Sequence, residues 1–124
     1  MTETIAAVVD GYFEMWNETD ADRRRAVIAG TWAQAASYVD PMFTADGYDG
    51  LDALVAGVHE KFPGHRFRLT DPVDVHHDRA RWGWELAPDG GAPIASGVDF
   101  AVLDPDGRLR EVTGFVAAAT GASG

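Results

Sequence analysis

The sequence contains no cysteine among its 124 residues. Disulfide bonds, zinc sites built from thiolates and cysteine nucleophiles are therefore excluded, because each of them needs a cysteine sulfur. Basic residues are also scarce: ten Lys and Arg stand against twenty Asp and Glu, which gives a net charge of −10. A chain this acidic repels phosphate groups, so neither nucleic acid nor an anionic membrane surface is expected as a partner.

A basic leader segment is missing as well. The first twenty residues, MTETIAAVVDGYFEMWNETD, contain acidic residues but neither Lys nor Arg. Secretory signal peptides begin with basic residues, so this pattern predicts a cytoplasmic protein. The length of 124 residues is that of one domain, which can bury one core and enclose one small pocket.

Helical patterns fill the first half of the chain. Residues 4–17 have apolar side chains at the i, i+3, i+4, i+7 spacing of one helix face, with Tyr12 facing inward. Thr19 precedes Asp22 by three residues, as in a capping box, and a second helix is predicted from there through TWAQAA at 31–36.

The segment ASYVDPMF, residues 36–43, is expected to be extended, because a residue that precedes proline avoids helical geometry. A third helix follows. Its predicted N-cap is Asp49, and the Pro-Gly pair at 63–64 should end it.

The second half consists of short β-branched and aromatic runs that are typical of strands. Turn sequences such as APDGGAP and DPDG separate these runs, which cover residues 65–70, 73–77, 79–86, 94–104 and 108–118. Three helices followed by antiparallel strands predict an α+β fold in which the helices cover one face of a curved sheet. Residues 1–118 are expected to form a single domain, and residues 119–124 a flexible tail.

The order of elements, with VDP before the third helix and GVDFAVLDPDGRLREVTGF near the end, resembles the nuclear transport factor 2-like superfamily. Within it, residues 3–118 are most similar to the SnoaL-like polyketide cyclases and the ketosteroid isomerases. This resemblance implies a cone-shaped α+β barrel around an apolar pocket. Ketosteroid isomerases have a tyrosine on the first helix, an aspartate before a proline and an aspartate on a later strand. Tyr12, Asp40 and Asp99 match these positions.

The resemblance also implies roles for the three residues. Isomerising an enone requires a base that moves a proton from carbon to carbon and donors that hold the charge formed on oxygen. Asp40 would be the base, and Tyr12 and a protonated Asp99 would be the donors, as in the neutral acid of ketosteroid isomerases. Period-two alternation supports this role, because Asp99 shares a strand face with Gly97 and Ala101, which offer no cation. Such proton transfer needs no cofactor.

Aromatic and sulfur-bearing residues are expected to line the pocket. The candidates are Trp32, Met42, Trp82, Trp84 and Phe115. Their side chains suit a small, flat hydrophobic ligand of the steroid or polyketide type, although each could equally be ordinary core. The comparable place for a further tyrosine on the third helix, which ketosteroid isomerases use, holds Val58 and His59.

Structural roles remain open for the three candidate catalytic residues. Tyr12 could be a core tyrosine with a backbone partner, Asp40 could only start the turn at Pro41, and a one-residue slip would turn Asp99 to solvent. Two other functions also remain. The first is water chemistry as in limonene epoxide hydrolases or dehydratases, and for the epoxide hydrolase type Arg79, Arg81 and Arg110 are the candidates to bridge the aspartates. The second is a non-catalytic, dimeric protein that binds a small ligand.

No metal site is predicted. His59 and Glu60 begin like a metalloprotease motif, but the second histidine is absent. His76 and His77 are adjacent, so they would point to opposite faces of a strand and fit a solvated turn better.

The outer face of the sheet is expected to be apolar. It would consist of Ile94, Ser96, Val98, Phe100 and Val102. An apolar strip of this kind needs a cover, and the family resemblance also implies dimers, so a homodimer through this face is predicted.

Overall fold

The computed structural model describes residues 4–117. Within this range it has three helices and seven strands: α1 (Ile5–Asn17), α2 (Ala21–Thr31), β1 (Trp32–Val39), β2 (Thr44–Asp46), α3 (Gly47–Lys61), β3 (His65–Leu69), β4 (Asp74–His76), β5 (Arg79–Pro88), β6 (Ala95–Leu103) and β7 (Leu109–Val116). The predicted tail at 119–124 lies outside the described residues. Over residues 4–117, no helix is long and apolar enough to cross a membrane.

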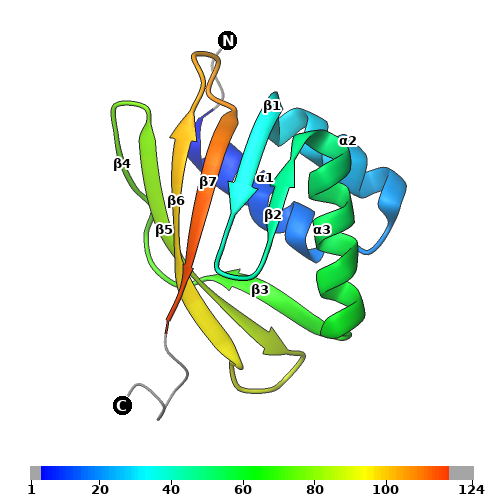
Figure 1. Ribbon diagram of the computed structural model, residues 1–124. Coiled ribbons are helices and arrows are strands. Elements are labelled where there is room, and N and C mark those ends of the chain that lie inside the picture. The colour runs from blue at the N-terminus through cyan, green and yellow to red at the C-terminus, as the bar shows by residue number, and fades with distance from the viewer. Residues whose placement is uncertain (1–3, 118–124) are drawn as a thin grey trace.

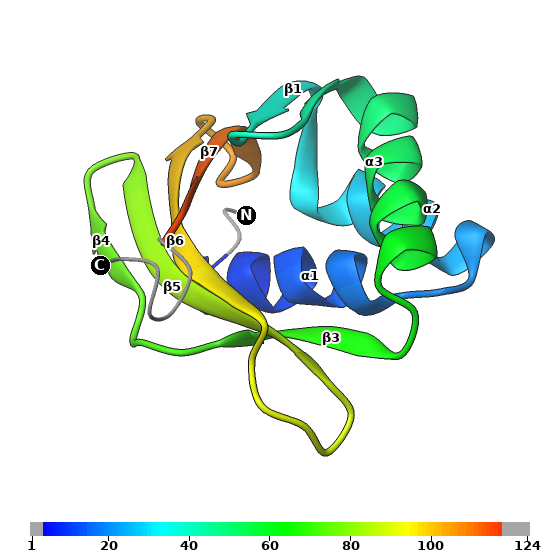
Figure 2. The same cartoon turned by 60° about the horizontal axis from the view of Figure 1, so that its bottom comes forward.

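The strands form one curved sheet in the order β2-β1-β7-β6-β5-β3, with β4 also paired to β5 (Figure 1). The pairing is antiparallel except between β1 and β7, which run parallel. Helix α1 lies on the concave side of the sheet, and α3 contacts β1 and β2 (Figure 2). The predicted α+β cone is therefore confirmed, although the sheet remains open and does not close into a barrel.

Helix α1 forms as its apolar spacing predicts. Thr4 is the N-cap, and its hydroxyl accepts a hydrogen bond from the Ala7 amide at 3.2 Å. The buried residues of α1 are Val8, Val9, Tyr12, Met15 and Trp16. A close crossing fixes α1 against α2, because any β-carbon at Gly11 would collide with the Thr31 hydroxyl. Tyr12 therefore reaches the centre of the molecule from a rigidly placed helix.

Helix α2 is shorter than predicted. It begins after Asp20, whose carboxylate accepts from the Arg23 amide at 2.9 Å, so Asp20 and not Thr19 is the N-cap. It ends at Thr31, and the predicted helical segment 31–36 belongs mostly to β1. The reason is tertiary: Trp32 pairs with Leu109 in the β1–β7 ladder, and its side chain is fully buried.

The third helix begins earlier than predicted and ends as predicted. Its N-cap is Asp46, so Asp49 lies in the first turn, where its carboxylate pairs with Arg25 at 2.8 Å. The helix ends at Lys61, just before the Pro-Gly pair at 63–64. The short strand β2, which no sequence pattern indicated, pairs with β1 directly before this helix.

Candidate functional site

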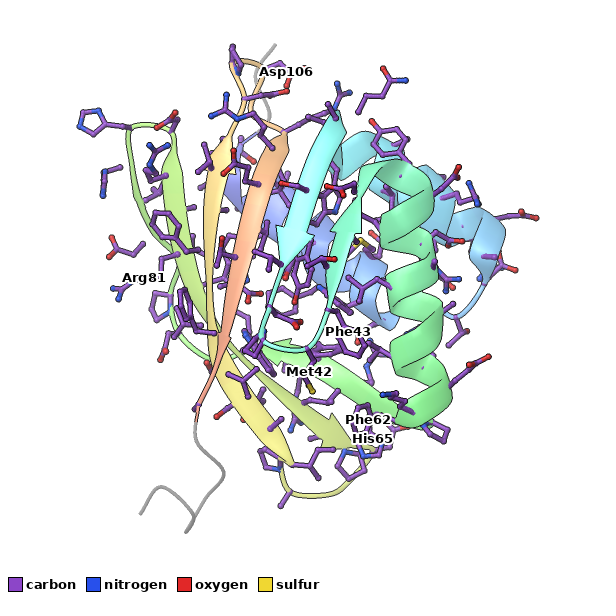
Figure 3. The ribbon with its side chains drawn as sticks, viewed as in Figure 1. Met42, Phe43, Phe62, His65, Arg81 and Asp106 are labelled. Atoms are coloured by element: carbon purple, nitrogen blue, oxygen red, sulfur yellow. The ribbon has the colours of Figure 1, made fainter. Side chains whose placement is uncertain are left out.

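An apolar cavity of about 90 Å³ lies between α1, the end of α3 and the concave face of the sheet. Its apolar lining comprises Phe13, Trp16, Met42, Phe43, Val58, Phe62, Phe67, Trp84, Leu86, Ala95 and Val116. Met42 and Phe43, on the β1–β2 connection, lie at the same end of the molecule as Phe62 (Figure 3). Four residues with hydroxyl or carboxyl groups complete the lining: Tyr12, Tyr38, Asp40 and Asp99. The cavity therefore combines apolar walls with a small polar cluster.

Tyr12 and Asp99 form the first pair in this cluster. The Tyr12 hydroxyl donates a hydrogen bond of 2.6 Å to Oδ2 of Asp99. Both side chains are almost completely buried, at 1% and 3% exposed. Burial raises the pKa of Tyr12 well above its ordinary value, and the nearby Asp99 charge raises it further. Tyr12 therefore stays protonated and acts as a donor.

Asp99 is the most perturbed carboxyl group of the cavity. Burial raises its pKa to about 7, and the Asp40 carboxyl contributes to the rise. The Tyr12 hydrogen bond and the neighbouring Trp84 and Trp82 indoles oppose this rise by favouring the charged form. Near neutral pH, Asp99 thus exists in both protonated and ionised forms, and its protonated form can donate a hydrogen bond.

Tyr38 and Asp40 form the second pair. The Tyr38 hydroxyl donates to Oδ2 of Asp40 at 2.7 Å, and the backbone amides of Met42 and Phe43 donate to Oδ1 at 2.8 Å each. Asp40 thus stabilises the turn that carries two walls of the cavity, and its carboxyl group also lines that cavity. Burial raises the pKa of Tyr38 far above its ordinary value, so Tyr38 remains a donor.

Gly114 is the point at which the two pairs meet. It lies opposite Asp99 in the β6–β7 ladder. A β-carbon at this position would lie 2.9 Å from Oδ1 of Asp99, 3.3 Å from Cβ of Asp40 and 3.3 Å from the Tyr38 hydroxyl. Glycine therefore leaves the space into which both aspartates project, and the Asp99 oxygen that does not accept from Tyr12 faces this space.

The predicted wall residues separate into three groups. Trp84 and Met42 line the cavity, and Met42 is 68% exposed at its edge. Trp32 and Trp82 are fully buried in the core and do not line it. Phe115 is 60% exposed on the opposite face of the sheet, because it pairs with outward-facing Val98 and follows inward-facing Gly114.

The histidines lie outside the cavity. His59 contacts the Trp16 carbonyl through Nε2 at 2.7 Å and lines a separate groove of about 320 Å³ with Pro63 and Arg66. His77 has a positive φ of 49° in the turn after β4, in agreement with the predicted turn. Residues 4–117 contain no cluster of His, Cys, Asp or Glu that could hold a metal ion.

The three candidate arginines also lie away from the cavity. Arg79 pairs with Asp78 at 3.0 Å, and Arg81 pairs with Asp74 at 3.1 Å. Arg81 points away from the helices (Figure 3). Arg110 is exposed on β7. None of the three bridges Asp40 and Asp99.

Tyr38 is the member of the polar cluster that the sequence interpretation missed, and most of the apolar lining was missed as well. Period-two alternation could have found it, because residues 38 and 40 of an extended segment share one face. Tyr38 thus provides a second tyrosine to the cluster from β1, whereas the comparable position on the third helix holds Val58, which lines the cavity with apolar surface.

No protein-family model matches the sequence, and no curated protein matches it. Among solved structures, a provisionally named isomerase of the SnoaL-like family from Agrobacterium tumefaciens is 34% identical, with a TM-score of 0.86, covering 91% of this chain and 97% of that one. A provisionally named SnoaL-like polyketide cyclase from a Jannaschia species is 21% identical, with a TM-score of 0.67, covering 94% of this chain and 90% of that one.

An NTF2-like protein of unknown function from Cytophaga hutchinsonii is 8% identical, with a TM-score of 0.66, covering 94% of this chain and 93% of that one. It and the Jannaschia protein share the fold alone. The identity to the Agrobacterium protein extends over nearly its whole length. The chain therefore belongs to the SnoaL-like family.

Proposed function

We propose that the cavity binds a small hydrophobic carbonyl compound and that its two aspartates catalyse proton transfer on it without a cofactor. The observation that carries this proposal is the convergence of Asp40 and Asp99 at Gly114 in a cavity whose walls are otherwise mainly apolar. The two carboxyl groups have different partners and different burial, which is how one site obtains an acid and a base. The family relationship supports the proposal.

Asp40 is the proposed base. In its ionised form, one of its oxygens would remove a proton from the carbon next to the ligand's carbonyl group. The electron pair left on carbon would move into the carbonyl group and place negative charge on its oxygen. Asp40 would then return the proton to another carbon, which completes a double-bond isomerisation. In an aldol-type cyclisation the enolate carbon would instead bond to a second carbonyl carbon, the π electrons of that carbonyl would move to its oxygen, and Asp40 would give its proton to the resulting alkoxide.

Asp99 is the proposed donor to the carbonyl oxygen. Its proton would lie on Oδ1, because Oδ2 already accepts the hydrogen bond from Tyr12. A buried donor aimed at developing negative charge stabilises the enolate more strongly than water does. Tyr12 would act through Asp99 by fixing its orientation and is therefore a positioning residue.

The arrangement of the arginines weighs against water addition of the limonene epoxide hydrolase type. That reaction uses an arginine that bridges two aspartates, whereas Arg79 and Arg81 pair with other acids and Arg110 is exposed. Non-catalytic binding of an apolar ligand is the remaining alternative, and the experiment below separates it from catalysis.

The test uses an enone and an epoxide in deuterated, oxygen-18-labelled water, with the wild type, Asp40→Asn and Asp99→Leu. Proton transfer predicts that the enone takes up deuterium at carbon and no oxygen-18. Asp40→Asn should slow this exchange by roughly 10² to 10⁴-fold. Asp99→Leu should slow it by about 10² to 10³-fold. This change also leaves the buried Tyr12 hydroxyl without its acceptor, so urea unfolding is used to check that the variant is folded before its exchange is compared.

Three outcomes contradict the proposal. Oxygen-18 in the product would indicate water addition. Saturable binding of the enone, seen as quenching of tryptophan fluorescence, without any deuterium exchange would indicate a binding protein. Exchange that is unchanged in both variants would mean that Asp40 only stabilises its turn.

A further inference from the structure

Asp40, the proposed base, lies in a turn and not in the sheet. It follows Val39, the last residue of β1. The same turn carries Met42, which is 68% exposed. A catalytic group on a turn is held less firmly than one on a strand, so its orientation depends on hydrogen bonds to its neighbours. The partners of the Asp40 carboxylate therefore decide how it can be used as a base.

Most acceptor positions of the Asp40 carboxylate are already occupied. A carboxylate has about four such positions, two on each oxygen. The backbone amides of Met42 and Phe43 both donate to Oδ1, at 2.8 Å each, and fill its two positions. The Tyr38 hydroxyl donates to Oδ2 at 2.7 Å and fills one more. Within residues 4–117, these hydrogen bonds leave one acceptor position of Asp40 open, and it is on Oδ2.

Tyr38 is held more firmly than Asp40. It lies inside β1, where it pairs with Ala45 of β2 and with Val112 of β7. Its side chain is only 6% exposed, and its ring packs edge-on against Trp16 of α1, with the ring centroids 5.7 Å apart. The hydrogen bond from its hydroxyl therefore connects Asp40 to the sheet and to the first helix.

The Tyr38 hydroxyl also lies beside the space that Gly114 leaves. A β-carbon at Gly114 would be 3.3 Å from this hydroxyl and 3.3 Å from Cβ of Asp40. The other titratable groups that line the cavity are Tyr12 on α1 and Asp99 on β6, and these two are bonded to each other at 2.6 Å. Among the residues that line the cavity, Tyr38 is thus the hydroxyl donor that serves Asp40.

We propose that Tyr38 is a positioning residue, which favours the ionised form of Asp40 and directs the open position on Oδ2 toward the reacting carbon of the ligand. This inference rests on the proposed function, because it needs Asp40 to act as a base. A donor to a carboxylate favours its charged form, and only the charged form can accept a proton. Burial raises the pKa of Tyr38 far above its ordinary value, so its own proton stays in place. The transferred proton moves from the ligand carbon to Oδ2 of Asp40 and back.

The test measures deuterium exchange of 2-cyclohexen-1-one by Tyr38→Phe, which removes the hydroxyl and keeps the ring. Exchange should slow about 5- to 50-fold through kcat, because Asp40 is oriented less firmly, while KM changes less than about 2-fold. The ascending limb of the pH profile of kcat/KM should move to higher pH by roughly half a unit to one unit, since Asp40 loses a donor that favours its charged form. A purely structural defect would slow exchange without moving this limb.

Tyr48→Phe is the matched control, because its hydroxyl donates to the Trp32 carbonyl at 2.9 Å outside the cavity. It should leave both the rate and the limb unchanged. In the Asp40→Asn background, Tyr38→Phe should slow exchange less than about 2-fold, because Tyr38 acts only through Asp40. Urea unfolding of each variant checks that it is folded.

The outcomes separate this inference from the proposed function. Unchanged exchange in Tyr38→Phe, or slower exchange with an ascending limb that stays in place, would overturn the positioning role and leave the proposed function standing. Further slowing in the Asp40→Asn background would also overturn it, because Tyr38 would then act on the ligand directly. A wild type that binds 2-cyclohexen-1-one without exchanging deuterium would overturn the proposed function, and the role of Tyr38 with it.

Discussion

The hydroxyl oxygen of Tyr12 lies 2.6 Å from Oδ2 of Asp99 and joins residues that are 87 positions apart. The bond links α1 to β6, and both of its partners are buried. A buried carboxyl group with a single completed side-chain hydrogen bond resists ionisation, because nothing nearby replaces the lost hydration of the charge. Ionisation of Asp99 should therefore lower the stability of the fold and also remove the proton that Asp99 donates in the cavity.

Asp99→Asn should remove a pH-dependent loss of stability. The pKa of Asp99 rises from an ordinary 3.8 in the unfolded chain to about 7 in the folded chain. Between these values the folded state binds more protons than the unfolded state, so the free energy of unfolding falls as pH rises from about 4 to about 7. The loss is on the order of 4 kcal/mol. Asn keeps the shape of the side chain without titrating.

Urea unfolding of both proteins at pH 4.5 and pH 8 measures this effect. The stability of the wild type relative to the variant should decrease between the two pH values. Parallel pH profiles for the two proteins would show that Asp99 ionises at its ordinary pKa.

Tyr12→Phe should raise the pKa of Asp99 above about 7. The hydrogen bond from Tyr12 favours the charged carboxylate, so its removal makes ionisation harder. The ¹³C chemical shift of the Asp99 carboxyl carbon, followed against pH, reports the change. Tyr48→Phe is the control, since its hydroxyl donates to the Trp32 carbonyl at 2.9 Å outside the cavity. An Asp99 pKa that moves down, or equally in both variants, would contradict the assignment.

Turnover of an enone should fall as pH rises through about 7. Asp99 donates only in its protonated form, and burial holds its pKa at about 7. Asp99→Asn should retain part of the activity and lose this descending limb, because an amide N–H group donates at every pH. The pH profiles of kcat/KM for the two proteins provide the comparison. The same limb in both profiles would assign it to another group.

The outer face of the sheet leads to a prediction of assembly. Val98, Phe100 and Phe115 lie there, 38%, 40% and 60% exposed. We propose that a second copy of the chain covers them, and we expect sedimentation equilibrium to show dimers at micromolar concentration. Phe115→Asp should produce monomers. Val75→Asp, a matched change at a residue that is 44% exposed and pairs with inward-facing Ala80, should not. A monomeric wild type would contradict the proposal.

Local sequence patterns were sufficient for the elements that carry Tyr12 and Asp99. The 3.6-residue apolar period defines the buried face of α1, and the two-residue period of β6 turns Asp99 inward. Both signals arise from the geometry of a single element. No distant contact is needed to interpret them.

Long-range pairing accounts for what the sequence did not reveal. TWAQAA has the composition of a helix, but Trp32 pairs with Leu109 on a strand far along the chain, and that contact overrides the local preference. Phe115 was assigned to the pocket although it alternates with Gly114 and faces outward. Trp82 and Trp84 lie two residues apart on β5, but only Trp84 lines the cavity. The alternation of the strand does not reveal which of the two residues lies at the level of the cavity.

Gly114→Ala should reduce turnover far more than it reduces stability. The new methyl group would lie 2.9 Å from Oδ1 of Asp99, so the carboxyl group or the strand must shift. Misplacement of a reacting group by about 1 Å can cost roughly 10²-fold in rate. Gly30→Ala is the matched control, because nothing lies within 4 Å of the added methyl group on the exposed surface of α2. Alanine is the better helix former there, so this variant should gain up to about 1 kcal/mol of stability with unchanged turnover. Stability is measured by urea unfolding and activity by enone turnover, in both variants. If Gly114→Ala keeps full activity, the space between the two aspartates is not where the ligand reacts.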